Sequence, residues 1–150
     1  MLSIKNLKKT YLAHRGSQIQ VYENLNLEIP KGEFITIFGP NGCGKTTLLS
    51  LIARLDKPDG GQIFFEKGST RISFIFQDYR QSLFPWHSVL DNISYPLKLQ
   101  GIKPHLRLRA VKELCKEFGV TIDLGSYPYQ LSGGQQQLVA IMRGLIIKPD

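Results

Sequence analysis

The feature that most constrains the fold is a glycine-rich loop between an apolar run and an amphipathic stretch. Residues 34–38 read Phe-Ile-Thr-Ile-Phe, which predicts a buried parallel strand. From Lys45 onward the leucines recur with helical spacing, which predicts a helix over 45–55. The loop between them, Gly39-Pro40-Asn41-Gly42-Cys43-Gly44-Lys45-Thr46, matches the P-loop pattern G-x-x-x-x-G-K-[ST] in full. A strand, this loop and a helix in that order predict an α/β fold that binds the phosphates of a nucleotide.

The backbone of such a loop is suited to an anion. Glycines let the chain wrap tightly around phosphate, and the N–H groups at the start of the helix are expected to point inward. We expect Lys45 to reach the β- and γ-phosphates and the Thr46 hydroxyl to coordinate Mg²⁺. Cys43 is interpreted as a small filler without a catalytic role. The expected nucleotide-binding residues of the loop are Gly39, Pro40, Asn41, Gly42, Cys43, Gly44, Lys45, Thr46 and Thr47.

A second glycine motif lies about ninety residues further along. Leu131-Ser132-Gly133-Gly134-Gln135 places a serine and two glycines at the entry to an apolar helix, expected over 132–147. This arrangement predicts a second anion-binding helix N-terminus. One γ-phosphate does not need two such sites from the same side of one chain, so two chains are expected to supply one half each.

With both motifs in place, the chain resembles the ATP-binding cassette (ABC) family, whose signature motif is LSGGQ. The resemblance makes 39–47 the Walker A motif and implies ATP and Mg²⁺ as ligands. It implies that Gln77 reaches Mg²⁺ and the attacking water, so Lys45 and Gln77 are the expected catalytic residues, and Thr46 and Gln77 the expected metal ligands. Tyr11 lies where the family has an aromatic residue that stacks on adenine, although a plain strand aromatic remains the alternative. Ser132, Gly133, Gly134 and Gln135 are expected to contact the nucleotide of the opposite subunit, in trans.

A finer resemblance concerns residues 83–92, Leu-Phe-Pro-Trp-His-Ser-Val-Leu-Asp-Asn. They look like a stretch of the ATPases that serve nitrate, sulfonate and taurine importers. Phe84 and Trp86 around a proline form an apolar loop that suits docking to a partner. Packing in the core is the alternative interpretation of these aromatics, and the sequence leaves both open.

The sequence departs from the family pattern at two places. Leu138 stands where members usually have arginine, and Met142 and Gly144 replace typical alanines. The sequence ends at Asp150, where the family continues into the Walker B strand. The Mg²⁺-binding carboxylate, the water-polarising glutamate and the switch histidine of the family are therefore not in this sequence, which leaves ATP hydrolysis by this chain undecided. His14, His87 and His105 precede this point and are interpreted as surface residues.

Composition excludes several classes. A hydrophobic share of 42% with 21% charged residues is typical of a globular protein. No apolar run reaches the roughly 18 residues of a membrane span, and no secretory signal is visible at the N-terminus. Two cysteines fit a reduced, cytosolic setting. The net charge of +7 is spread without a basic run longer than Lys8-Lys9, so we expect no nucleic-acid partner.

These observations predict an α/β fold, a P-loop NTPase (ABC ATPase) core with an N-terminal β subdomain and a helical subdomain, C-terminally incomplete. The expected division is a β-rich nucleotide-binding core over 1–84, with strands also over 4–12, 19–29, 63–65 and 72–76, and a helical subdomain over 85–147, with helices over 89–99 and 106–118. The expected function is the ATP-binding subunit of an ABC importer on the cytoplasmic face of the inner membrane. Its expected partners are integral membrane permease subunits, a second ABC subunit in a homodimer or mixed pair and, indirectly, a solute-binding protein. The alternative is a non-transport ABC ATPase acting on DNA or ribosomes, or a regulatory fragment that binds ATP without turnover.

Overall fold

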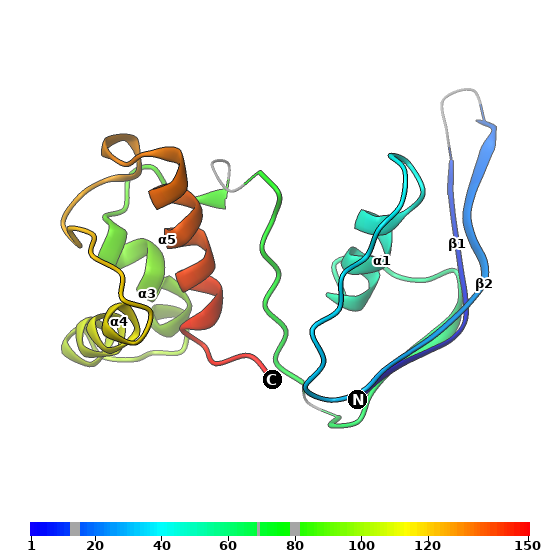
Figure 1. Cartoon of the computed structure of the whole chain (residues 1–150), viewed down its shortest axis with the longest axis horizontal. Helices are drawn as coiled ribbons and strands as arrows, with labels where there is room; N and C mark the ends of the chain where they lie inside the picture. Colours follow the sequence, from blue (N-terminus) through cyan, green and yellow to red (C-terminus); the bar gives the residue numbers. More distant parts are fainter. Residues whose placement is uncertain (13–15, 69, 79–81) are drawn as a thin grey trace. The chain divides into compact units, whose positions relative to one another are not determined.

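The computed structural model describes residues 1–12, 16–68, 70–78 and 82–150 (Figure 1). The chain divides into two compact units, Met1–Thr70 and Arg71–Asp150. His14, interpreted above as a surface residue, lies outside the described residues. Within the described part of the chain, no helix is long and apolar enough to cross a membrane.

The first unit contains a three-stranded antiparallel sheet and one helix. The strands are β1 (Leu2–Leu12), β2 (Gln18–Ile29) and β3 (Gly60–Phe65), in the spatial order β2-β1-β3. Helix α1 (Lys45–Ile52) follows the glycine-rich loop. The core of this unit consists of two β1 residues and two α1 residues, Ile4, Leu7, Leu48 and Leu51, all nearly inaccessible to solvent. Burial of these side chains therefore fixes α1 against the central strand.

An irregularity in β1 decides which side chains share its faces. Asn6 has a positive φ of 51°, and the pairing register with β2 shifts between Ile4 and Leu7. An extra residue of this kind moves the later side chains to the opposite face of a strand. As a result Leu7 and Lys9 are both buried, and Tyr11 follows them two residues further along the same strand.

The second unit is helical. It contains α3 (Val89–Leu99), α4 (Pro104–Glu117), a 3₁₀ turn, η2 (Pro128–Gln130), and α5 (Gly133–Leu145). The predicted helix over 89–99 is confirmed, and Pro104 occupies the first turn of α4, where its missing N–H costs nothing. The core joins α3, α4 and α5 through Val89, Ile93, Val111, Val139 and Met142.

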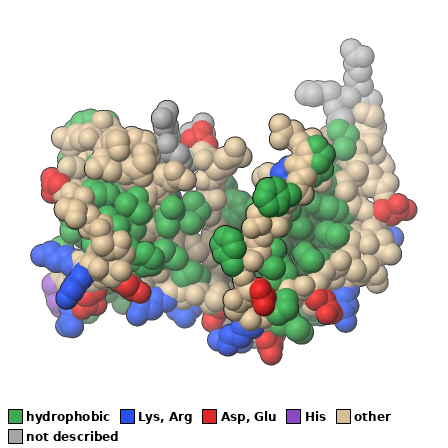
Figure 2. Space-filling view, viewed as in Figure 1, with side chains coloured by type: hydrophobic (Ala, Val, Ile, Leu, Met, Phe, Trp, Pro, Cys, Tyr) green, Lys and Arg blue, Asp and Glu red, His purple; other side chains and the backbone are tan. Residues whose placement is uncertain are grey.

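Two predicted strands are not observed. Residues 34–38 and 72–76 have no strand pairing, and Phe34 and Phe38 are 93% and 88% exposed. A strand depends on hydrogen bonds to a neighbour, and no described segment pairs with either run. Figure 2 shows hydrophobic side chains gathered on the visible face of each unit. The prediction of a buried parallel strand over 34–38 was therefore wrong for this chain, although the segment is apolar.

Candidate functional site: a phosphate-binding loop and its surroundings

The glycine-rich loop leads into α1 through a backbone position that only glycine can occupy without strain. Gly44 is the N-cap of α1 and has a φ of 97°. A Cβ at this position would lie 2.6 Å from Cγ1 of Val21 and 2.7 Å from the hydroxyl oxygen of Tyr22. The Tyr22 hydroxyl donates a hydrogen bond of 2.8 Å to the Gly44 carbonyl, and burial raises the pKa of Tyr22. Strand β2 therefore holds the start of α1 by direct contact.

This start of α1 presents free donors to the loop. The first N–H that bonds back into the helix is that of Leu48, to the Gly44 carbonyl at 2.9 Å. The preceding N–H groups, including those of Lys45, Thr46 and Thr47, belong to the first turn, where a helix has no internal acceptors for them. A Cβ on Gly42 would meet no atom within 4 Å. The loop is open on this side, and its donors fit an anion such as phosphate.

Lys45 lies folded over the same loop. Its Nζ donates hydrogen bonds of 2.7 Å to the carbonyls of Gly39 and Pro40 and lies 3.7 Å from Sγ of Cys43. An ammonium group has three donors, and a thiol is the weakest acceptor of these three partners. A phosphate oxygen would therefore take the donor that now faces Cys43. This geometry agrees with Cys43 having no chemistry of its own.

The described residues fit a metal ion only in part. Thr46 is exposed at the first turn of α1, where its hydroxyl is accessible. Among the described residues no group of three or more His, Cys, Asp or Glu side chains could hold a metal. Mg²⁺ bound with nucleotides takes most of its ligands from phosphate oxygens and water, with one or two from the protein. Thr46 fits that supporting role and no larger one.

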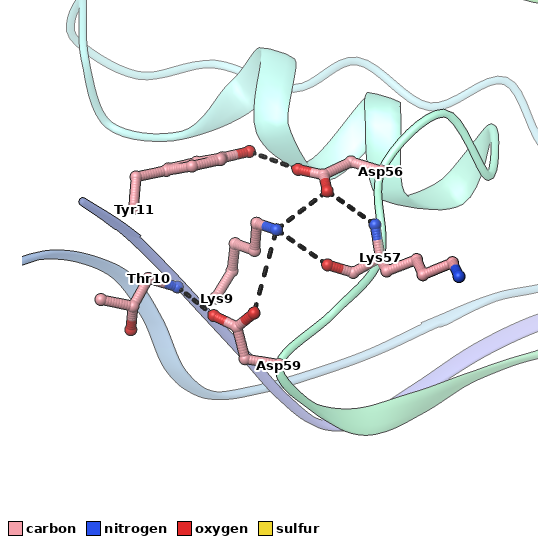
Figure 3. A network of polar contacts seen from close by, with 6 residues as sticks. All are labelled: Lys9, Thr10, Tyr11, Asp56, Lys57 and Asp59. Atoms are coloured by element: carbon pink, nitrogen blue, oxygen red, sulfur yellow. Dashed lines mark hydrogen bonds and ion pairs between the residues drawn. The ribbon is translucent and has the colours of Figure 1, made fainter. Parts of the chain in front are cut away.

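Tyr11 belongs to a network of polar contacts at the other end of α1 (Figure 3). Its hydroxyl donates a 2.7 Å hydrogen bond to Oδ2 of Asp56. Lys9 Nζ donates bonds of 2.9 Å to Oδ1 of Asp56 and 2.8 Å to the Lys57 carbonyl, and lies 3.9 Å from Asp59. The hydrogen bond from Tyr11, followed by that from Lys9, lowers the pKa of Asp56 to about 2.

The pKa values of the other two partners respond to the same contacts. The hydrogen bond to Asp56 raises the pKa of Tyr11, and a hydrogen bond with the Thr47 side chain opposes that shift. The Asp56 hydrogen bond also raises the pKa of Lys9. Tyr11 is thus held by Asp56, which lies beyond the C-terminal end of α1. The structure brings Tyr11 and the phosphate loop together in one unit.

The second glycine motif forms the start of α5. Ser132 Oγ accepts a hydrogen bond from the Gln135 N–H at 3.3 Å, and Gln135 Oε1 accepts one from the Ser132 N–H at 2.9 Å. This capping box fixes the helix entry and leaves the Ser132 hydroxyl proton available for another acceptor. A Cβ on Gly134 would meet nothing within 4 Å. The turn is therefore ordered by its own side chains and open on the glycine side.

Gln136, which the sequence analysis did not single out, supports this turn. Its Nε2 donates to the carbonyls of Pro128 and Leu131 at 2.8 and 3.2 Å. Gln77 lies at an exposed position of the second unit, after the unpaired segment 72–76. The proposed catalytic and signature residues of this unit thus lie on α5 and on an irregular segment.

The aromatic loop 84–88 is organised by a buried asparagine that sequence reasoning missed. Asn92 is inaccessible to solvent, accepts a hydrogen bond from the Phe84 N–H, and donates to the carbonyls of Phe84, His87 and Ser88 at 3.0, 3.0 and 3.1 Å. Phe84 packs on Tyr95 with ring centroids 4.7 Å apart, whereas Trp86 is 70% exposed. The two aromatics therefore divide between packing and surface. The only signal in the sequence was the Asn one turn into a predicted helix.

Comparison with known proteins agrees with this combination of motifs. The ABC transporter family profile matches residues 22–150. The chain is 41% identical to an uncharacterized ABC transporter ATP-binding protein of Methanocaldococcus jannaschii, covering 99% of this chain and 57% of that protein. It is 41% identical to an Fe(3+) ions import ATP-binding protein of Pasteurella multocida and 39% identical to an aliphatic sulfonates import ATP-binding protein of Bacillus cereus. These alignments cover 99% of this chain and 43% and 59% of the two proteins, so the chain spans about half the length of the curated relatives it matches.

Solved structures confirm the fold class. The dimeric structure of a bacterial ABC transporter cassette superimposes with a TM-score of 0.86 at 34% identity, over 99% of this chain and 71% of that one. A post-hydrolysis structure of the same cassette, bound to ADP and Pi, superimposes equally well. The phosphate loop, the second glycine motif, the family match and the shared fold lead to one conclusion: this chain belongs to the ABC transporter family and has the α/β fold of its ATP-binding cassette.

Proposed function

We propose that this chain is the nucleotide-binding part of the ATPase subunit of an ABC importer. The observation that carries the proposal is the loop before α1, where Gly44 has a positive φ that other residues rarely adopt and the Lys45 ammonium bonds the loop carbonyls of Gly39 and Pro40. Relatives named as import ATP-binding proteins, at 38–43% identity, support import rather than a role on DNA or ribosomes.

In this proposal the residues have distinct roles. The N–H groups at the start of α1 and the Lys45 ammonium bind the ATP phosphates and stabilise the charge that develops during transfer. Mg²⁺, when bound, neutralises phosphate charge, with Thr46 and Gln77 as its protein ligands. Tyr11 contacts the adenine. Lys45 and Gln77 are the proposed catalytic residues of the described chain, and Gln77 orients the attacking water.

A second subunit completes the site. The Ser132 hydroxyl and the α5 N-terminus, with Gly133, Gly134 and Gln135, would bind the nucleotide held by the opposite cassette. The spare donor of Ser132 supports this, because its oxygen already accepts within the capping box. The similar cassette whose solved structure is dimeric supports a pair of such subunits.

The proposed partners at the membrane are permease subunits, with a solute-binding protein acting through them. Trp86, 70% exposed beside a proline, offers the permease an apolar contact. We extend the proposal to a small oxoanion-type solute, nitrate, sulfonate or taurine, on the 83–92 sequence and the sulfonate importer relative. Relatives named for Fe(3+) and for spermidine/putrescine match at similar identity, so direct binding of radiolabelled solutes to the import system must decide the solute.

The nucleotide proposal is tested with Lys45→Ala. Replacing this cation should raise the Kd for Mg-ATP more than about tenfold, because a charge-assisted contact is worth about 1.5–3 kcal/mol. Lys5→Ala, an exposed lysine on β1, is the matched control and should bind like the wild type. Equal affinities for all three proteins in a calorimetric titration would refute the assignment of the loop.

A further inference from the structure

The contacts around Lys9 go beyond what a strand needs for its own stability. Lys9 is only 6% exposed, although its ammonium is charged. Burying a cation is unfavourable unless it is paired and hydrogen-bonded. Here two carboxylates and the Lys57 carbonyl provide that pairing, and all of them come from the turn between α1 and β3. The Lys9 ammonium on β1 is therefore held by groups of the turn between α1 and β3.

Asp56 is the hub of these contacts. Its carboxylate accepts from Lys9 at 2.9 Å, from the Tyr11 hydroxyl at 2.7 Å and from the Lys57 N–H at 2.7 Å. Asp56 follows the C-terminal end of α1, and the N-terminal end of the same helix forms the phosphate loop. The ring is consequently tethered to the turn that follows the helix whose start forms the phosphate loop.

The ring itself remains available. Tyr11 is 38% exposed, and the Lys9 ammonium lies 4.8 Å from its centroid, on one side of the ring in Figure 3. A cation over one face leaves the opposite face for a planar ligand. Aromatic side chains are general platforms for nucleobases, because every base has a π-face. An exposed ring in the unit that carries the phosphate loop has the right chemistry for the base of the same nucleotide.

We propose that Asp56 and Lys9 are positioning residues for the nucleotide base: they hold Tyr11 so that its free face receives the base when the phosphates occupy the loop. This inference rests on the proposed function. It adds a tether that acts through Tyr11 and touches neither phosphate nor base. Since stacking reads a π-face and no base edge, ATP and GTP should depend on the tether equally.

If the contacts of Lys9 and Asp56 served only to stabilise the fold, a different result would be expected. Asp59 belongs to the same network, accepts from the Thr10 N–H and pairs with Lys9, but does not contact Tyr11. Asp59→Ala removes the same charge as Asp56→Ala from the same turn. If the network only joined β1 to this turn, the two variants would affect nucleotide binding alike. If it positions the ring, only Asp56→Ala changes recognition of the base.

The experiment compares a ligand that has a base with one that lacks it. Calorimetry measures the Kd of Mg-ATP and of Mg-tripolyphosphate for the wild type, Asp56→Ala, Lys9→Met, Tyr11→Phe and Asp59→Ala. The ratio of the two constants largely cancels changes in the protein's net charge, because both ligands carry a triphosphate chain. Tyr11→Phe keeps the ring and removes only the tethering hydroxyl, so it provides a test even if a charge variant folds poorly.

We expect the preference for ATP over tripolyphosphate to fall about five- to tenfold in Asp56→Ala, Lys9→Met and Tyr11→Phe, at the lower end of the range of base–aromatic stacking. Asp59→Ala should keep the wild-type ratio, and the tripolyphosphate Kd should stay within about twofold throughout. An unchanged ratio in both Asp56→Ala and Tyr11→Phe, with tripolyphosphate still bound, would overturn this inference and leave the proposed function intact. Failure of the wild type to bind either ligand would overturn both.

Discussion

The buried amide of Asn92 is the single polar side chain on which the aromatic loop depends most directly. Asn92→Ala removes the acceptor of the Phe84 N–H and the donors to three carbonyls. Each hydrogen bond is worth about 0.5–1.5 kcal/mol net, and each buried group left without a partner costs about 1–3 kcal/mol. The two amide protons and one acceptor bond together give an expected loss of about 3–4 kcal/mol in the free energy of unfolding.

The replacement by aspartate separates hydrogen bonding from packing. Asn92→Asp keeps the shape and the acceptor for the Phe84 N–H, but it places a carboxylate against three carbonyl oxygens. A buried charge without a donor is more costly than a missing amide, so Asn92→Asp should be at least as destabilising as Asn92→Ala at neutral pH. Its stability should recover partly in acid, because protonation restores one donor.

Urea denaturation of the whole chain, followed by circular dichroism, measures these differences. Gln137→Ala, on the exposed side of α5, is the control and should stay within about 0.5 kcal/mol of the wild type. If Asn92→Ala lost less than about 1 kcal/mol, the loop would not depend on this amide, and our account of how Trp86 is presented would be wrong.

Three further predictions follow from the two units. Gly44→Ala should weaken Mg-ATP binding and lower the unfolding free energy by about 1–3 kcal/mol in thermal unfolding, because the new Cβ would meet Val21 and Tyr22 at a positive φ. Gly68→Ala, with open space around it, is the control and should change neither property. Wild-type binding by Gly44→Ala would count against the loop geometry. Phe84→Ser should cost about 2–4 kcal/mol of unfolding free energy, since the Phe84 ring packs on Tyr95. Trp86→Ser should cost less than about 1 kcal/mol and instead reduce co-purification with the permease, because the Trp86 side chain is exposed. The reverse pattern would contradict a packing role for Phe84 and a surface role for Trp86. The pKa of Asp56 is about 2 in the folded chain against about 3.9 unfolded, so the stability that its ionised carboxylate contributes is complete above about pH 4 and is lost as the pH falls toward 2. In urea titrations the difference in unfolding free energy between wild type and Asp56→Asn should therefore be constant from about pH 5 to 8 and shrink below about pH 4. A difference that grows in acid would refute the assigned contacts.

The features of this chain that depend on neighbouring residues could be predicted from its sequence. The glycine spacing predicted the phosphate loop, because a tight turn with a positive φ selects glycine wherever it occurs, and Gly44 confirms this. The helix over 89–99 and the capping of the α5 entry by Ser132 follow from residues within one turn of each other. Signals of this kind do not depend on the rest of the fold.

The tertiary structure decided what depends on distant partners. An apolar run such as 34–38 becomes a strand only beside another strand, and in this chain it remains unpaired and exposed. The contacts of Lys9 and Tyr11 with Asp56 join residues about 45 positions apart, and no periodicity in the sequence reports a pairing of that range. Residue spacing records the geometry of the local backbone, whereas pairing and burial are set by which surfaces meet, and that is why the loop was predictable and its tether was not.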